Sequence, residues 1–590
     1  MLGLRSDQRG LFEADHLYLD YVGRDSFYGF LASQRGRLFR DEEFAELYCP
    51  DNGRDSVPPS LLANALLLQT HDRASDEEAK ARANFDIRWK VALGIAIDEK
   101  PFAKSTLQLF RAQLILHEKI RAVFQRSLKF ARETGYMKSH HRMKIALDTT
   151  YILGRGAVKD TYNLLADGIV QILRALAALE DRKAEAWAKE RGYERYFSSS
   201  IKGEANINWD DEESCRAFLR GIVADADRLL ELAREAQGQI PNDDYRRQGI
   251  IEAAKLLGQL LLQDVERKEE GAVLKEGVSP DRIISVHDPQ IRHGRKSSNV
   301  LFDGSKAAVA VDTDNQLFTA ADVIAGNASD KTGAIKLVEQ SEENTDCPVD
   351  ESIGDCAYGD GATRQAFADA HRTLIAKVPS RPNKVHFPKE DFKIDLEEGT
   401  CVCPAGHITR TLRPMGNLPD GHGGRQKSLG FVFDGRICRA CSLRSNCVSG
   451  KIRRGRTVRL HPQEALLQQA RTFQHSEAFG EYRRRRQTAE HRLARLVQLG
   501  IRKARYFGRV KTRFQLLIAA TVANLTLVAV KMGMMRAAGG KAFSLFLSRL
   551  HALITFLIVF SLLSQSYYSR CTKQTIRQES PPKRAFRPNF

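Results

Sequence analysis

The sequence predicts a multidomain protein of the α/β class, and three observations carry this prediction. The chain has 590 residues, which is too long for one hydrophobic core and corresponds to roughly three or four folding units. Apolar residues at strand spacing occur in residues 143–153 and again in residues 306–326. Segments with helical spacing lie before, between and after these strands, so we expect a sheet combined with many helices.

The N-terminal segment of the chain, residues 1–135, is predicted to be a small all-α domain. VPPSLLANALLLQT starts at residue 57 with two prolines and Ser60, which is typical of a helix start, and continues with helical apolar spacing. STLQLFRAQLILHEK starts with Ser105 as a cap and then places apolar residues on one side. Both segments therefore predict helices separated by short breaks.

The remaining chain is divided by changes in pattern. GIIEAAKLLGQLLLQDVERKEE indicates a helical insert between two strand-bearing regions, and Asp314-Asn315 between two apolar runs predicts a hairpin turn. VDESIGDCAYGDGATRQAFADA predicts a short strand, a turn and a helix. The predicted regions are a first core segment (136–180), the helical insert (181–278), a second core segment (279–380), a Cys-rich insert (381–465), a third core segment with a basic helix (466–535) and a hydrophobic then polar tail (536–590).

Two predicted strands carry an aspartate where an apolar residue would be expected. Asp148 lies within KIALDTTYILGRG, and Asp355 follows another apolar strand in GDCAYGDG. A buried ionised carboxylate is costly unless it is paired or binds a metal. Because strands far apart in the chain can be neighbours in a mixed sheet, and because carboxylate oxygens suit Mg²⁺ or Mn²⁺, the two residues predict a metal site.

A third carboxylate would complete a two-metal site, and Glu490 is the candidate. It lies on the most basic predicted helix, where helical spacing puts it on one stripe with Tyr482 and Arg486. The alternative interpretation is an ordinary i, i+4 surface pair of Arg486 with Glu490, which stabilises a helix by only a few tenths of a kcal/mol. Spacing alone leaves both interpretations open.

Basic charge is concentrated in one region of the chain. The formal net charge is +18, and residues 451–513 contain 18 Lys and Arg, four Glu and no Asp. Such a segment predicts a polyanionic partner, although a solvated basic face is the simpler alternative. The candidate contacts are Arg483, Arg484, Arg485, Arg486, Lys503, Arg505, Arg509, Lys511 and Arg513, together with Lys306 on a predicted strand.

Several of these segments resemble a known family. DTTYILGRGAVKDTYNLL, VAVDTDNQLFTAADVIAGNASD, GDCAYGDG and RRRRQTAEHRLARL, followed by ARYFGRVKTRFQLLIAATVANL, resemble bacterial insertion-sequence transposases of the DDE class over roughly residues 15–535. The resemblance implies a ribonuclease-H-like core, which is a mixed sheet flanked by helices. Asp148 on its first strand, Asp355 on its fourth and Glu490 on a later helix would be the catalytic, Mg²⁺- or Mn²⁺-binding triad.

The same resemblance implies an activity and partners. We expect metal-dependent cleavage of double-stranded DNA at the ends of an insertion sequence and strand transfer into target DNA, without a covalent protein intermediate. It also implies that the N-terminal helical domain serves DNA binding or assembly and that the protein forms a homo-oligomer in the synaptic complex. Two alternatives are a ribonuclease-H-like nuclease that does not join strands and a catalytically inactive, transposase-derived DNA-binding protein.

The sequence departs from one related branch of these enzymes. That branch carries Y-x2-R-x3-E-x6-K around the glutamate, whereas here Tyr482 lies one residue too far from Arg486 and Val497 stands where the lysine would be. The resemblance therefore assigns Glu490 more firmly than its neighbours. Other acids near predicted strands or turns compete for the site, namely Asp160, Asp288, Asp303, Asp312 and Asp360. The simplest interpretation of Asp312 and Asp360 is turn chemistry.

Five cysteines gather in the Cys-rich insert. Cys401 and Cys403 form a C-x-C pair, and Cys438, Cys441 and Cys447 form C-x2-C-x5-C, with His407 nearby. Ten cysteines in 590 residues are too few for a disulfide scaffold, so the cluster favours one tetrahedral structural zinc. Five thiols exceed the four that zinc needs, which leaves the ligands unassigned, and unliganded cysteines are the alternative.

The N-terminus and the tail bear on location. MLGLRSDQRG is already charged and no apolar segment of a signal peptide follows, so we expect a cytoplasmic, nucleoid-associated protein. HALITFLIVFSLL, residues 551–563, is strongly apolar but shorter than the roughly 20 residues that cross a bilayer. We therefore expect a packed C-terminal helix rather than a membrane anchor.

Overall fold

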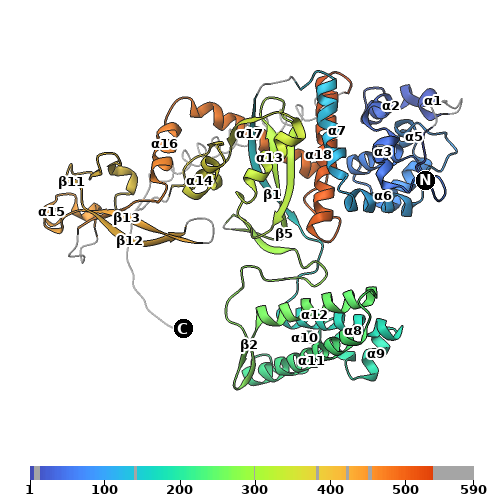
Figure 1. Ribbon diagram of the computed structural model, residues 1–590, viewed down its shortest axis with the longest axis horizontal. Coiled ribbons are helices and arrows are strands. Elements are labelled where there is room, and N and C mark those ends of the chain that lie inside the picture. The colour runs from blue at the N-terminus through green and yellow to red at the C-terminus, as the bar shows by residue number, and fades with distance from the viewer. Residues whose placement is uncertain are drawn as a thin grey trace, which may run out of the picture.

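The computed structural model describes residues 1–5, 13–137, 142–297, 299–380, 385–419, 424–448 and 455–535. A central mixed sheet has helices on both faces, with N-terminal helices on one side of it and a small Cys-containing unit on the other (Figure 1). The predicted α/β class is confirmed. The apolar segment 551–563 lies outside the described residues.

The central sheet follows the order β4-β5-β1-β7-β8, and β6 pairs with β5 as well. β1 runs antiparallel to β5 and parallel to β7, and β7 runs parallel to β8. The sheet is therefore mixed, as the sequence predicts. Its strands are β1 (Met143–Leu153), β4 (Arg292–Ser297), β5 (Val300–Asp312), β6 (Phe318–Ala325), β7 (Val349–Ile353) and β8 (Thr373–Ile375).

The predicted hairpin around Asp314-Asn315 is confirmed between β5 and β6. Asp312 ends β5, and its carboxylate accepts the backbone N–H groups of Asp314 and Asn315 at 2.9 and 3.3 Å. The Asn315 side chain donates back to it at 2.6 Å. Asp312 is thus occupied in turn chemistry, as its sequence context predicts.

Helices cover both faces of the sheet. One face packs against α17 (Phe479–Gln498) and α18 (Arg509–Lys531), and the apolar core continues from there into the N-terminal helices. The other face packs against α13 (Ala334–Thr345) and α14 (Gly361–Asp369). Side chains of β1 alternate between the two cores, so that Ala146 and Ile152 face α18 while Ile145 and Leu147 face α13.

Helix α18 is buried on nearly all sides because it lies between the sheet and α7 (Figure 1). Asn524 fixes it to the edge strand, since its side-chain amide donates to the Phe318 carbonyl and accepts the Phe318 N–H, both at 2.9 Å. Two helical segments, Thr161–Glu180 and Arg509–Lys531, are long and apolar enough to cross a membrane. Their most apolar windows are 61% and 83% buried inside the protein, as in the core helices of a folded domain.

The N-terminal unit is all-helical, as predicted. It begins with α1 (Ala14–Val22) and ends with α7, and its apolar residues share one core with α18. Ser75 caps one of its helices in a capping box with Glu78. The other elements are α2 (Phe27–Leu38), η1 (Asp41–Leu47), α3 (Pro59–His71), α4 (Asp76–Phe85), α5 (Ile87–Leu93), α6 (Lys104–Leu116) and α7 (Ile120–Glu133).

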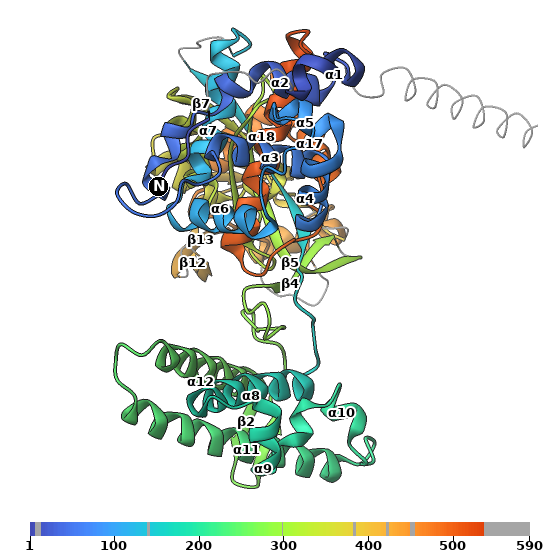
Figure 2. The same cartoon turned by 90° about the vertical axis from the view of Figure 1, so that its right-hand side faces the viewer.

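A separate helical unit lies between β1 and β4 in sequence and below the sheet in space (Figure 2). It has its own apolar core, and that core includes α8. The helical unit therefore begins with α8, inside the segment 136–180 that we predict as the first core segment. Its elements are α8 (Thr161–Ala177), η2 (Ala178–Glu180), α9 (Ala184–Glu190), η3 (Glu194–Phe197), α10 (Ile201–Glu204), α11 (Glu212–Gln239), α12 (Tyr245–Asp264), β2 (Val265–Lys268) and β3 (Gly271–Leu274).

The described part of the Cys-containing unit consists of short strands and three short helical segments. Among its described residues, its core cluster consists of five buried apolar side chains, namely Phe392, Cys401, Phe431, Phe433 and Val458. The unit connects to the sheet through α16 (Glu464–Gln474), which contacts α14. Its elements are η5 (Lys389–Asp391), β9 (Lys393–Asp395), β10 (Thr400–Val402), β11 (Ile408–Thr409), β12 (Leu412–Pro419), β13 (Arg425–Val432), α15 (Gly435–Ala440), η6 (Arg444–Asn446) and β14 (Thr457–Arg459).

Candidate active site

The register of the sheet brings Asp148 and Asp355 to the same place. β1 and β7 are parallel, and Ala146 pairs with Ile353. Asp148 lies two residues beyond Ala146, and Asp355 lies two residues beyond Ile353. Both carboxylates therefore stand at the point where β7 ends and η4 (Cys356–Tyr358) begins.

Glu490 comes to these aspartates from α17, which packs on β1, β5 and β7. Burial raises the pKa of the Asp148 carboxyl to about 6, and the negative charges of Asp355 and Glu490 add to the rise. The N–H of Thr149 and the charge of Arg486 oppose it. The structure thus brings the three predicted acids into one electrostatic site.

Each of the three carboxylates has one oxygen bound by the protein. Asp148 accepts the Thr149 N–H at 2.7 Å, Asp355 accepts the Ala357 N–H at 2.8 Å, and Glu490 pairs with Arg486 at 2.8 Å. Within the described region of the chain, no hydrogen bond or ion pair engages the second oxygen of any of them. Those oxygens remain available to a cation.

The ion pair between Arg486 and Glu490 is the one that helical spacing predicts. Its presence does not remove Glu490 from the site, because both side chains also act on Asp148. Glu490 is 48% exposed and Arg486 is 27% exposed, so the pair lies at the open side of the site. The two interpretations of this spacing are therefore compatible.

Tyr358 belongs to this site, although the sequence pattern did not single it out. Its side chain is 1% exposed, and its hydroxyl has no hydrogen-bond partner among the described residues. Burial raises the pKa of Tyr358 well above its ordinary value, and the charges of Asp148, Asp330 and Asp355 add to the rise. The signal that could have revealed it is the position of this tyrosine three residues after Asp355 in GDCAYGDG.

Tyr482 has a structural contact instead of a place beside Glu490. Its hydroxyl donates to Glu351 of β7 at 2.8 Å, and Lys144 of β1 lies over its ring and pairs with the same Glu351 at 2.7 Å. These contacts fasten the start of α17 to both strands that carry the aspartates. Tyr482 is therefore a positioning residue for the helix that holds Glu490.

The arginines of α17 divide into two groups. Arg483 and Arg484 are exposed, and no ion pair engages them among the described residues. Arg485 is bound by Glu481 at 2.8 Å and also by Asp314 and Thr313 of the β5–β6 turn. Arg492 is buried and donates to the Ala523 carbonyl of α18 at 2.8 Å. The charge run thus contains both free surface cations and cations that hold the helix in place.

The second basic segment lies beside the end of β1. Leu153 exchanges backbone hydrogen bonds with Arg502 and Ala504, both at 2.9 Å, which places Lys503 next to this strand. Leu153 is about 17 Å from Asp148 along the strand, since a strand rises by about 3.3 Å per residue. Lys503 and Lys511 are exposed, and Arg509 is half-buried.

Besides Arg485 and Arg486, three further predicted DNA contacts are bound by the protein itself. Arg505 donates to the Ala74 carbonyl of the N-terminal unit at 2.9 Å, and Arg513 pairs with Asp322 at 3.4 Å. Lys306 is only 8% exposed, and its ammonium donates to the Ala328 carbonyl and to Asp330 at 2.7 and 2.8 Å. The prediction that Lys306 faces DNA is corrected, because two protein oxygens hold its ammonium inside.

The competing aspartates have other partners. Asp160 and Asp360 cap α8 and α14, and Asp360 also pairs with Lys331 at 2.7 Å. Asp303 pairs with His293 at 2.6 Å. Burial raises the pKa of Asp288, which lies near the backbone N–H groups of Gly508 and Gln290. The turn or cap chemistry predicted for Asp360 is confirmed, as it is for Asp312.

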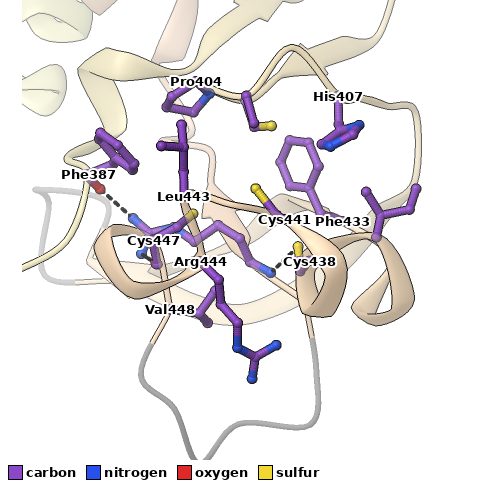
Figure 3. A pocket seen from close by; sticks show the side chains of 14 residues that line it. Phe387, Pro404, His407, Phe433, Cys438, Cys441, Leu443, Arg444, Cys447 and Val448 are labelled. Carbon is purple, nitrogen blue, oxygen red and sulfur yellow. Dashed lines mark hydrogen bonds between the residues drawn. The ribbon is translucent and has the colours of Figure 1, made fainter.

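The cysteines separate into one core residue and four pocket residues. Cys401 is fully buried between β9 and β11 and packs in the small core of the unit. Cys403, Cys438, Cys441 and Cys447 line one pocket with a volume of about 20 Å³. Figure 3 shows Cys438, Cys441 and Cys447 around this pocket, with His407 at one side.

The pocket thiols also interact electrostatically with one another. Burial raises the pKa of Cys447; Arg456 opposes the rise, and Cys438, Cys403 and Cys441 contribute to it. Burial raises the pKa of Cys401 to about 11, with Cys403 as the only other thiol that contributes. The four pocket cysteines are thus one cluster, and Cys401 lies at its edge.

Neither ligand set is fully drawn together. Among the residues that the structure describes, only Glu13, Asp15 and His16 have three ligand atoms all within 4.8 Å of one another. Asp15 in that group pairs with Arg35 at 2.7 Å. The three acids must therefore move closer together to bind a metal, and the same holds, at their own site, for the cysteines.

Comparisons with known families agree with this arrangement. Residues 402–529 match the family described as transposase DDE domain, and residues 24–113 match the family described as transposase domain (DUF772). The first match includes Glu490 and the four pocket cysteines, and it begins beyond Asp148 and Asp355. No curated protein and no solved structure matched the chain.

Both matches are to transposase domains, from the two ends of the described chain. Together they support a DDE-type insertion-sequence transposase, which confirms the resemblance seen in the sequence. Transposases of that class act on DNA, and a divalent metal is their usual cofactor.

Proposed function

We propose that this chain is a DNA transposase that cleaves DNA at the ends of an insertion sequence and joins those ends to target DNA, using Asp148, Asp355 and Glu490. The observation that carries the proposal is the convergence of these three acids from two parallel strands and one helix. Glu490 also lies within the transposase DDE domain match.

The sheet supports a ribonuclease-H-like core. Counted without β4, which pairs only with the start of β5, the strands follow the spatial order β6-β5-β1-β7-β8. β5 is antiparallel to both β1 and β6, and β7 and β8 are parallel to β1. Asp148 then lies on the first strand, Asp355 follows the fourth, and Glu490 lies on a later helix. In this interpretation the helical unit and the Cys-containing unit are inserts in the core.

The donor set fits a divalent cation. Three carboxylates each keep a second oxygen without a protein partner in the described chain. Burial and the charges of the neighbouring acids raise the pKa of Asp148, and a bound positive charge would favour the ionised carboxylate again. Asp148, Asp355 and Glu490 would hold Mg²⁺ or Mn²⁺, which prefer such oxygen ligands. Bound there, two cations would activate the attacking oxygen and stabilise the leaving oxygen.

The chain's own cations would position the DNA. Arg486 lies beside the carboxylates, where its guanidinium can pair with a phosphate while Glu490 turns to the metal. The exposed cations are Arg483 and Arg484 on the same helix, Lys503 beside the end of β1, and Lys511 in the first turn of α18. They would neutralise backbone phosphates.

Both reaction steps are phosphoryl transfers, and each forms one P–O bond as another breaks. In the first, water attacks a phosphodiester at the element end and a P–O bond breaks, which frees a 3′-hydroxyl. In the second, that hydroxyl attacks a target phosphodiester, so one P–O bond forms as another breaks. Positioning and charge stabilisation drive such steps, and no covalent bond to the protein is needed. Synapsis of two ends would require a homo-oligomer.

The test compares two glutamates of one helix. Glu490→Gln and Glu481→Gln each remove a carboxylate that pairs with an arginine four residues away, but only Glu490 acts on Asp148. With Mg²⁺ and DNA carrying the element's ends, we expect Glu490→Gln to lower cleavage and joining by on the order of 10²–10³-fold, as for the loss of one charge-stabilising group. Glu481→Gln should keep activity close to that of the wild type.

Other outcomes separate the alternatives. Equal activity of wild type and Glu490→Gln would overturn the triad. Cleavage by the wild type without joined product would favour a nuclease, and DNA binding without either product would favour an inactive derivative.

A further inference from the structure

We propose that Cys403, Cys438, Cys441 and Cys447 bind one structural zinc ion, and that Cys401 and His407 are not ligands. The proposal concerns the Cys-containing unit and is independent of the triad. The sequence offered five thiols for four positions, and the structure selects among them.

The four thiols come from two short local motifs that face each other. Cys403 follows β10 and starts a tight turn, in which its carbonyl accepts the Gly406 N–H at 2.8 Å and its N–H donates to the His407 carbonyl at 2.9 Å. Gly406 has φ of 84°, a conformation that favours glycine. Cys438 lies in α15, Cys441 follows it directly, and Cys447 follows η6.

The pocket between the two motifs suits a single ion. Its volume of about 20 Å³ exceeds the roughly 10–15 Å³ needed for one water-sized particle. Apart from the thiols, its wall is largely apolar, with Phe433, Ile437 and Val448 among the lining residues. Four thiolates leave a tetrahedral zinc no open position, so the site would be structural rather than catalytic.

Neighbouring groups provide the support that metal-bound thiolates usually need. The backbone N–H of Arg456 donates to the Cys438 sulfur at 3.5 Å. The guanidinium of Arg456 donates to the carbonyls of Cys447 and Phe387 at 2.9 and 2.8 Å, which fixes a positive charge beside the pocket. Four thiolates and Zn²⁺ carry a net charge of about −2, and a nearby cation reduces the cost of that charge.

Cys401 and His407 are excluded for different reasons. Cys401 is fully buried among Phe392, Phe431 and Val458, and it does not line the pocket. His407 lines the pocket but is exposed, and the four thiols already complete a tetrahedral set.

The unit also needs a stabilising element of this kind. Its core cluster has five buried apolar side chains among the described residues, which is a small core for strands β9 to β14. Small folding units with such cores commonly depend on a metal or on disulfides. No three of the four sulfurs all lie within 4.8 Å of one another, compared with the roughly 3.8 Å expected around tetrahedral zinc, so binding would draw the two motifs together and order the unit.

The experiment measures zinc in the full chain by elemental analysis. We expect about one zinc per chain in the wild type, in Cys401→Ser and in His407→Ala. We expect a small fraction of that in Cys438→Ser and in Cys447→Ser. A wild-type chain without zinc, or Cys401→Ser that loses zinc as fully as Cys438→Ser, would overturn the proposal.

A second measurement does not depend on whether the variants fold. X-ray absorption of the zinc-bound wild-type chain should show four sulfur neighbours at about 2.3 Å. A nitrogen neighbour at about 2.0 Å would place His407 in the ligand set and overturn the four-cysteine assignment. Neither measurement uses DNA, so the result does not depend on transposase activity.

Discussion

The carboxylate site and the cysteine pocket are built in opposite ways. The carboxylates come from β1, from the end of β7 and from α17, and these elements meet only because the whole sheet forms and α17 packs on it. The cysteines lie within residues 403–447 and are placed by short turns and by α15. One site is a product of long-range packing, and the other is a product of local structure.

This difference predicts different roles for the two metals. The core behind the carboxylates extends through α18 into the N-terminal helices and is large. Its fold does not need a cation, which can bind with the DNA and leave with it. In the described part of the chain, the core behind the cysteines has five buried apolar side chains, so a share of its folding free energy would come from zinc.

We expect the largest experimental effect from removing each metal separately. If the two removals did not differ in their consequences, the two sites would not have the different roles described above. In Mg²⁺-free buffer we expect joining of DNA ends to stop completely and to return when Mg²⁺ is added, with zinc content and protease resistance unchanged. A mercurial thiol reagent should release zinc and expose residues 385–460 to protease, while the sheet remains protected. Limited proteolysis with mass spectrometry measures the protection of each region, and elemental analysis measures the zinc content.

The comparison would be wrong if both treatments had the same consequence. Protease sensitivity of residues 385–460 in Mg²⁺-free buffer alone would mean that this unit does not depend on zinc. Protection of the same residues after complete zinc release would mean that its small core is sufficient.

The sequence singled out the acids that the fold brings together, but not the residues around them. Asp148 and Asp355 are visible because an acid interrupts an apolar strand, and this pattern survives folding. Tyr358 was missed because a tyrosine near a turn has no distinctive pattern, and only the folded η4 shows its buried hydroxyl. Lys306 was misjudged because its partner Asp330 is distant in sequence and becomes adjacent only when β5 and β6 pair.

The cysteines show the opposite limit. Cys401 and Cys403 look equivalent in C-x-C, but Cys401 belongs to β10 and packs into the core, while Cys403 has left the strand. The boundary of the helical unit failed for a similar reason. α8 follows β1 closely in sequence, yet its apolar face packs against α11 and α12.

A smaller effect is the pH dependence of stability in the metal-free protein. Burial and the neighbouring acids raise the pKa of Asp148 from an ordinary value of 3.8 to about 6 in the folded state. The stability contribution of such a group is fully present below about pH 4 and is lost as pH rises through about 6. Without a divalent cation, Asp148→Asn should therefore gain thermal stability over the wild type as pH rises from 4 to 7.

Adding Mg²⁺ at pH 7 should change the stability difference between the wild type and Asp148→Asn. A bound cation removes the repulsion among the carboxylates, so the wild type should be stabilised more than Asp148→Asn, by a few degrees in a thermal-shift assay. If the difference between wild type and variant were the same at pH 4 and pH 7, with and without Mg²⁺, Asp148 would not belong to a charged, cation-binding cluster.

The smallest effect distinguishes the two kinds of arginine on α17. Arg483 and Arg484 are exposed, whereas Arg485 is bound by Glu481 and Asp314. Each lost phosphate contact lowers the slope of log affinity against log salt concentration by about 0.9 for duplex DNA. Arg483→Ala and Arg484→Ala should each flatten that slope by up to this amount, measured by fluorescence anisotropy across a salt series.

Arg485→Ala should leave the slope unchanged and reduce thermal stability instead, because it frees the turn between β5 and β6 from α17. A slope for Arg485→Ala as flat as that for Arg483→Ala would mean that DNA displaces the Asp314 pair, so that the arginine fastening the helix also binds the phosphate backbone.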